Sequence, residues 1–223
     1  MTRPMKLTAA ILLTSCLAIS AATLSTTEMP AAGFDIVSWN NWKGQEFRIG
    51  EIPDDSQVIS ATLRLEFVVA NANFVVRIVS SEGSPGRPNM DDVRATFYPL
   101  TMTSGTEVGL YTFQTDRQVE YPPMQPNASY WLIAGMTAVD PEESNPAGLV
   151  RWHYTATSGP DAGATSGWSV GGLISNSNTE GAQWISAAET PYQFNLTAVT
   201  VPEPGSLMLL LPATAFLLRR RKS

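Results

Sequence analysis

Cysteine and histidine are almost absent from this chain of 223 residues, which has one of each, Cys16 and His153. Cys16 lies in an N-terminal segment that we expect to be removed, so the mature protein would hold no disulfide. Its domain would then depend on the hydrophobic core alone. Because no second histidine and no further cysteine are present, the sequence does not support a zinc site, and we expect no metal and no cofactor.

Charged residues are also scarce, at 15% of the chain, and basic ones are scarcest in its central part. Once two basic residues near the N-terminus, four near the C-terminus and Glu203 are set aside, 8 basic and 19 acidic residues remain, a net charge near −11. Such a surface repels phosphate backbones, so we expect no nucleic-acid partner. Ser, Thr, Asn, Gly and Pro fill the deficit, as in extracellular β-proteins.

A sustained helical period is missing between residues 31 and 199, where apolar and polar residues alternate instead. With no helices to make parallel crossovers, the fold class is all-β, an antiparallel β-sandwich or jelly roll over residues 39–200, preceded by a leader at 23–38. The predicted strands are 46–49, 59–67, 74–80, 95–100, 110–115, 129–136, 149–155, 184–186 and 192–199.

The N-terminus has the layout of a secretory signal peptide. Arg3 and Lys6 precede an apolar run, and small residues follow as far as Ala22. The pattern predicts a signal helix within residues 1–22, with cleavage near Ala21 or Ala22. As an alternative, Leu13-Thr14-Ser15-Cys16 resembles a lipobox, in which Cys16 would be lipidated and become the first residue.

The C-terminus has a short apolar run, Leu207 to Leu218, that stops on four consecutive cations. Its 12 residues would extend about 18 Å as a helix, less than the roughly 30 Å of a hydrocarbon core. Cations at the end of such a run stay on the cytoplasmic side. The sequence therefore predicts a weak membrane helix over 205–218 and a basic tail at 219–223, with the stop residues Arg219, Arg220, Arg221 and Lys222.

This C-terminal region, with Val201-Pro202-Glu203-Pro204 ahead of the apolar run, resembles the PEP-CTERM sorting signal. That signal occurs on exported proteins of Gram-negative bacteria that make exopolysaccharide. The resemblance implies that the membrane enzyme exosortase recognises the motif and acts near it. It also implies export through the inner membrane, anchoring by the C-terminal helix, and delivery to the cell surface or extracellular matrix.

The central part resembles the choice-of-anchor R domain, a β-rich bacterial surface domain whose members carry different C-terminal anchors. The resemblance implies a surface location but no activity, so it assigns no functional residue. The motifs that carry it are Asn41-Trp42, Phe47-Arg-Ile-Gly50, Val76-Arg-Ile, Gly83-Ser-Pro-Gly86, Tyr111-Thr-Phe113, Ser129-Tyr-Trp-Leu132, Trp152, Gly167-Trp168 and Tyr192-Gln-Phe194.

One motif raises the question of catalysis. Gly167-Trp-Ser169-Val-Gly171 fits the Gly-x-Ser-x-Gly nucleophile elbow, which needs a strand before the serine, a helix after it and a later histidine. Here a second glycine, Gly172, follows the motif where the helix should begin, and the only histidine, His153, precedes the serine. We therefore expect no enzyme and assign no catalytic residue, and a secreted hydrolase is the least favoured alternative. His153, between two aromatic residues of a predicted strand, is expected to be an ordinary surface or edge imidazole.

Carboxylates gather at Asp54-Asp55, at Asp91-Asp92 and around Glu142. Oxygen ligands of this kind hold Ca²⁺ in extracellular proteins, but no EF-hand loop or glycine-rich calcium repeat is present. We expect solvated loops there.

Tryptophans are the most informative residues of the central part. Trp131 and Trp152 lie in the middle of predicted strands and are expected in the core. Trp168 and Trp184 have Gly- and Ser-rich neighbours and are the candidates for stacking on sugar rings. The sequence thus indicates a structural or adhesive protein of the cell surface or exopolysaccharide matrix. The alternative, a carbohydrate-binding module, requires Trp168 and Trp184 to be exposed and coplanar.

Overall fold

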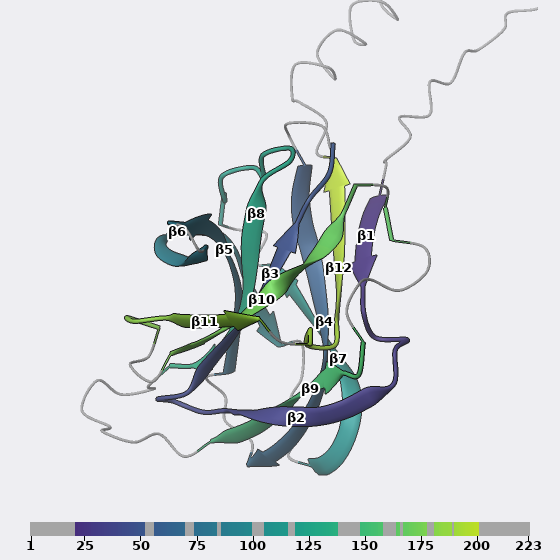
Figure 1. Cartoon of the computed structure of the whole chain (residues 1–223), viewed down its shortest axis with the longest axis vertical. Coiled ribbons are helices and arrows are strands. Elements are labelled where there is room, and N and C mark those ends of the chain that lie inside the picture. Colours follow the sequence, from purple (N-terminus) through teal and green to yellow (C-terminus); the bar gives the residue numbers. More distant parts are fainter. Residues whose placement is uncertain are drawn as a thin grey trace, which may run out of the picture.

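The computed structural model describes residues 21–51, 56–69, 74–83, 86–99, 105–115, 119–137, 148–157, 164–165, 167–177, 181–188 and 190–200. Within these residues the protein is all-β, without a helix (Figure 1). The strands are β1 (Ala21–Ser25), β2 (Ala31–Val37), β3 (Trp42–Arg48), β4 (Ser56–Val69), β5 (Phe74–Glu82), β6 (Arg87–Pro99), β7 (Gly105–Thr115), β8 (Ser129–Met136), β9 (Leu149–Thr155), β10 (Ser169–Ser177), β11 (Ile185–Ala188) and β12 (Phe194–Thr200).

The twelve strands form one antiparallel sheet that folds back on itself. Its order is β1-β12-β4-β7-β6-β5-β8-β3-β10-β11, while β9 pairs with β4 and β2 pairs with β9. The long strand β4 pairs with β12 along its first half and with β9 along its second half. The main hydrophobic core joins side chains from both halves of this order, so the arrangement is sandwich-like, and the predicted all-β antiparallel class is confirmed.

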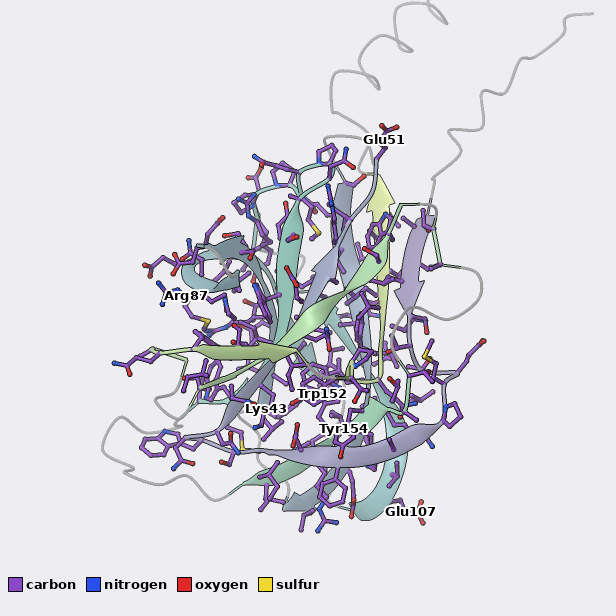
Figure 2. The ribbon with its side chains drawn as sticks, in the orientation of Figure 1. Lys43, Glu51, Arg87, Glu107, Trp152 and Tyr154 are labelled. Atoms are coloured by element: carbon purple, nitrogen blue, oxygen red, sulfur yellow. The ribbon has the colours of Figure 1, made fainter. Side chains whose placement is uncertain are left out.

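Apolar and polar side chains alternate along the predicted strands, and the apolar ones point into the core. In β4, the inward side chains from Ala61 to Phe67 are buried to 1% exposure or less, whereas Arg64 and Glu66 between them point outward and are half-buried. Trp152 of β9 is fully buried in the interior, as predicted (Figure 2). Its ring stacks on that of Tyr192, with centroids 4.3 Å apart.

A second cluster of apolar side chains lies on the other face of β3, β5 and β8. Strand β8 is buried on both faces, because alternate residues point into the main core and into this second cluster. Trp131 was correctly predicted to be buried. The second cluster consists of Trp42, Val75, Val79, Trp131 and Ile133, with Met90, Val93 and Trp184 packed against it.

The folded domain begins earlier than the sequence predicts. Residues 23–38, expected as a leader, contain most of β1 and all of β2. Strand β1 runs beside β12, with Ala21 opposite Val199, and Leu24 is fully buried. Thr26 is also buried: its Oγ1 donates to the carbonyl of Tyr192 at 2.7 Å. These residues are therefore part of the domain rather than a linker to it.

Strand β10 was not predicted, and β6 runs through Asp91 and Asp92, where a solvated loop was expected. The described residues contain no helix with the length and apolar character needed to cross a membrane. Residues 1–20 of the predicted signal helix, including Cys16, lie outside the described residues, and its last two residues, Ala21 and Ala22, belong to β1. The Val201 to Pro204 motif, the membrane helix and the basic tail also lie outside the described residues.

Candidate functional site

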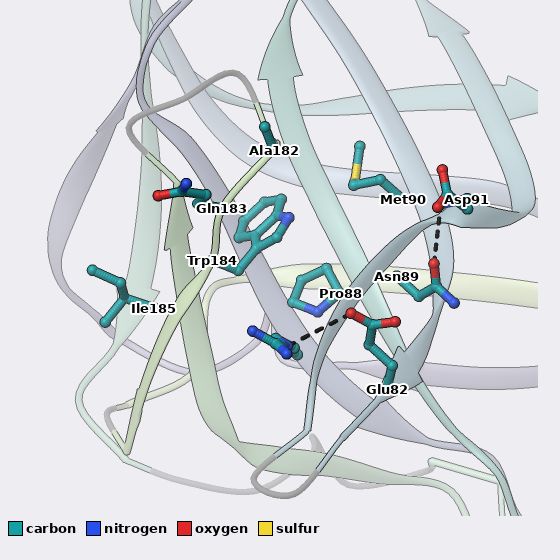
Figure 3. A pocket seen from close by; sticks show the side chains of 11 residues that line it. Glu82, Pro88, Asn89, Met90, Asp91, Ala182, Gln183, Trp184 and Ile185 are labelled. Carbon is teal, nitrogen blue, oxygen red and sulfur yellow. Dashed lines mark hydrogen bonds and ion pairs between the residues drawn. The ribbon is translucent and has the colours of Figure 1, made fainter.

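A pocket of about 580 Å³ lies between the β5–β6 hairpin and the segment that leads into β11 (Figure 3). These two walls are about 100 residues apart in the chain, and the second cluster lies beneath them. The residues that line the pocket are Glu82, Arg87, Pro88, Asn89, Met90 and Asp91 from the hairpin, and Gly181, Ala182, Gln183, Trp184 and Ile185 from the facing segment.

Trp184 is the aromatic residue that lines the pocket. Its side chain is half-buried, and one edge reaches over Gly44, where an added Cβ would lie 3.6 Å from Cζ3 of the indole. Met90 approaches from the hairpin, with its Cε 3.2 Å from the position of a Cβ at Gly181. Gly181 has φ +85°, a conformation that favours glycine. The indole and the methionine are therefore held against the second cluster rather than free in solvent.

Polar groups surround this apolar surface. Arg87 Nε lies 3.6 Å from Glu82 Oε1, and both side chains are about half exposed. Asn89 Oδ1 accepts a 3.1 Å hydrogen bond from the backbone N–H of Asp91. The exposed carboxylate of Asp91 has no ion-pair partner among the described residues. The pocket thus combines an indole, an amide, a guanidinium and carboxylates.

The two walls are tied together at one end by hydroxyl groups. Ser186 of β11 donates from Oγ to the carbonyl of Gly86, in the turn of the β5–β6 hairpin, at 3.2 Å. The same Oγ lies 3.0 Å from Oγ of Ser175 in β10. These bonds and the contact of Met90 at Gly181 join the two walls of the pocket at separate points.

Glu46 of β3 packs close behind the hairpin turn. Its Oε2 lies 2.5 Å from the position that a Cβ would take at Gly171, so a side chain at this point of β10 would displace it. The pairing of β10 with β3 shifts register between Val170 and Ile174, around the same glycine. Partial burial raises the pKa of the Glu46 carboxyl.

Trp168, named as a candidate for stacking on sugar, is 4% exposed and belongs to the main core. The condition of an exposed, coplanar pair with Trp184 is therefore not met, and a sugar site here would have to use one indole. Gly167 has φ +82° and lies against Gly50, and the chain then enters β10 with the indole of Trp168 turned inward. Of these two tryptophans, Trp184 is the one that lines the pocket described above. The sequence did not identify the wall of the pocket that the β5–β6 hairpin forms. The turn motif from Gly83 to Gly86, between charged residues, was the one indication of this hairpin.

The structure does not bring Ser169 and His153 together as a nucleophile and its base. Ser169 opens β10 opposite Arg48, and a strand follows it where an elbow needs a helix. The sequence suggested that His153 lies at the surface or at a sheet edge. Instead it lies on β9, between β2 and β4, and is only 9% exposed. Its Nε2 has no hydrogen-bond partner among the described residues. Burial, followed by the charge of Arg64, lowers the pKa of His153.

The carboxylates that the sequence offered for Ca²⁺ are not assembled within the described ranges. Asp92 is paired with Arg94, whose Nη2 is 2.7 Å from Oδ2. Asp54, Asp55 and Glu142 lie outside the described residues. Across the part of the chain that the structure describes, no three or more His, Cys, Asp or Glu side chains are grouped so that they could hold a metal ion.

The chain matches no protein-family model, and no curated protein matches it in sequence.

Proposed function

We propose that this chain is an exported protein of the cell surface or exopolysaccharide matrix, sorted by exosortase, and that it has a structural or adhesive role. We further propose that adhesion takes place by binding of polysaccharide in the pocket at Trp184. The observation that carries this second step is a half-buried indole surrounded by amide, guanidinium and carboxylate groups in a preformed pocket.

The chemistry of the pocket suits a sugar. A pyranose ring has an apolar face of C–H groups, which stacks on an indole, and a rim of hydroxyls that both donate and accept hydrogen bonds. Asn89 and Gln183 offer amide groups, and the Glu82–Arg87 pair offers an acceptor and a donor beside them. About 580 Å³ lies within the roughly 300–1,000 Å³ usual for small-ligand sites.

The arrangement of the chain ends supports the export and anchoring part of the proposal. Because Ala21 at the start of β1 pairs with Val199 near the end of β12, the preceding and following segments are attached at the same end of the domain (Figure 1). A sandwich or jelly roll with a signal helix before it and a membrane helix after it could therefore be held at one membrane surface by either end.

Fractionation of the native host, with and without exosortase, tests the sorting. Mass spectrometry of both termini should show loss of residues 207–223, and the protein should leave the membrane only when exosortase is present. An intact C-terminus in the membrane fraction under both conditions would contradict sorting by exosortase.

Sedimentation of the purified protein with the host exopolysaccharide tests the binding. Trp184→Ala should lower the affinity at least tenfold, because it removes the stacking surface. Trp39→Ala is the matched control: Trp39 is also half-buried, lies in the β2–β3 turn and is not part of the pocket. Equal loss in both variants, or no loss in either, would argue against this site.

A further inference from the structure

The pocket has more negative than positive side chains. Of its three charged side chains, Arg87 and Glu82 form a pair with each other at 3.6 Å. Asp91 is exposed and has no cationic partner in the described part of the chain. The nearest arginine in sequence, Arg94, is occupied by Asp92 and by the carbonyl of Pro123. The pocket therefore presents one uncompensated carboxylate.

The backbone of Asp91 is held by the side chain of Asn89, two residues earlier. The Asn89 side chain accepts the backbone N–H of Asp91 at 3.1 Å, which holds this short stretch of β6 in place (Figure 3). Asp91 and Trp184 line the same pocket from opposite walls. A ligand that rests its apolar face on the indole would thus have a carboxylate within the same cavity, and a cation on that ligand would be favoured by a charge-assisted hydrogen bond.

We propose that the sugar unit bound in this pocket is a hexosamine with a free ammonium group, as in a de-N-acetylated polysaccharide. The ammonium binds Asp91, the C–H face stacks on Trp184, and the hydroxyls bind Asn89. The net charge near −11 of the central part of the chain draws such a polycation toward the protein. This inference rests on the proposed polysaccharide binding and adds the class of sugar.

The test compares three oligosaccharides of equal length on the purified protein: β-1,4-linked glucosamine, its fully N-acetylated form and a neutral β-1,4-glucan. Calorimetric titration is done at a pH below the pKa of the sugar amine. The free amine should bind at least tenfold more tightly than the other two, and Asp91→Asn should remove this preference. Glu107→Gln is the matched control, since this substitution also removes one exposed negative charge. Figure 2 shows Glu107 well away from Arg87 of the pocket.

The possible results separate the two proposals. Equal affinity for all three sugars, lost in Trp184→Ala, would overturn the amino-sugar assignment and leave polysaccharide binding in place. A preference for the free amine that Asp91→Asn keeps, or that Glu107→Gln also loses, would mean that net charge rather than this pocket selects the ligand, and would overturn the assignment. Binding neither to these sugars nor to the host exopolysaccharide would overturn both proposals.

Discussion

The indole of Trp42 fills the space in which any residue other than glycine at position 135 would place its Cβ. An ideal Cβ on Gly135 would lie well under 3.0 Å from three atoms of that ring. Both residues are buried, in the neighbouring strands β3 and β8. The glycine is therefore required by packing in the second cluster and not by a turn.

Gly135→Ala should destabilise the protein by about 1–3 kcal/mol, because the added methyl group would displace the buried Trp42 ring. Gly44→Ala is the control in the same layer, since an added Cβ there would meet Trp131 and Trp184 at ordinary distances of 3.5 and 3.6 Å. Urea unfolding measures both. If the two variants were equally stable, the close packing of Trp42 on Gly135 would be wrong.

Trp168→Ala should destabilise the domain by about 3–5 kcal/mol, the usual cost of removing a large aromatic side chain from a core. Trp184→Ala should cost less, because its side chain is only half-buried. Chemical denaturation of the two variants separates a core role from a surface role. A larger loss of stability for Trp184→Ala would reverse the assignment made from burial.

Leu24→Ala should destabilise the domain by about 2–5 kcal/mol, because the side chain of Leu24 points from β1 into the main core and is fully buried. The exposed Ala32 of β2 gives the control: Ala32→Ser should leave the unfolding midpoint nearly unchanged. An unaffected midpoint in Leu24→Ala would mean that β1 is not part of the folded domain.

His153 should titrate below its ordinary pKa of 6.5, because burial and the charge of Arg64 disfavour the imidazolium form. The unfolded chain takes up this proton at a higher pH than the folded one. Stability is therefore lost as the pH falls from about 6.5 through the lowered pKa of the folded state. As His153 is the only histidine, its ring proton can be followed by NMR without ambiguity. A midpoint at or above 6.5 would contradict the buried position.

Glu46 should show the opposite dependence. Its pKa in the folded state is raised above 4.5 by burial, so the folded protein holds the proton more tightly than the unfolded chain does. Stability then falls as the pH rises from about 4.5 through the raised value and stays lower above it. Glu46→Gln should therefore be more stabilising at pH 7 than at pH 4 in urea unfolding, whereas Glu107→Gln should show little change. The same effect of Glu46→Gln at both pH values would exclude a raised pKa.

The strands that could be predicted are those with a clear pattern of apolar residues in their own sequence. The bounds of β8 and β9 were predicted to the residue, because continuous or alternating apolar side chains mark strands that are buried on at least one face. Strand β1 was missed because its small residues coincide with the expected end of a signal peptide. Strand β10 was missed because Gly171 and Gly172 interrupt its alternation, and its pairing with β3 supplies what local pattern does not.

The candidate site was only half predictable for a similar reason. Trp184 was found from its polar, small-residue neighbours, but the same rule placed Trp168 at the surface, where it is not. The opposite wall, with Asn89 and Asp91, comes from a hairpin about 100 residues away. No sequence period connects two such segments, and only the folded sheet brings them together.

Hydrogen exchange of the purified protein, with and without the host exopolysaccharide, tests the central claim of a ligand pocket most directly. Backbone amides of the hairpin wall, residues 86, 87 and 89–91, and of the facing segment, residues 181–186, should exchange more slowly when the polysaccharide is present, because a bound sugar covers the pocket between them. Amides of β2 and β9, in the other half of the sheet, should not change. Protection over β2 and β9 alone, or no protection anywhere, would contradict the account.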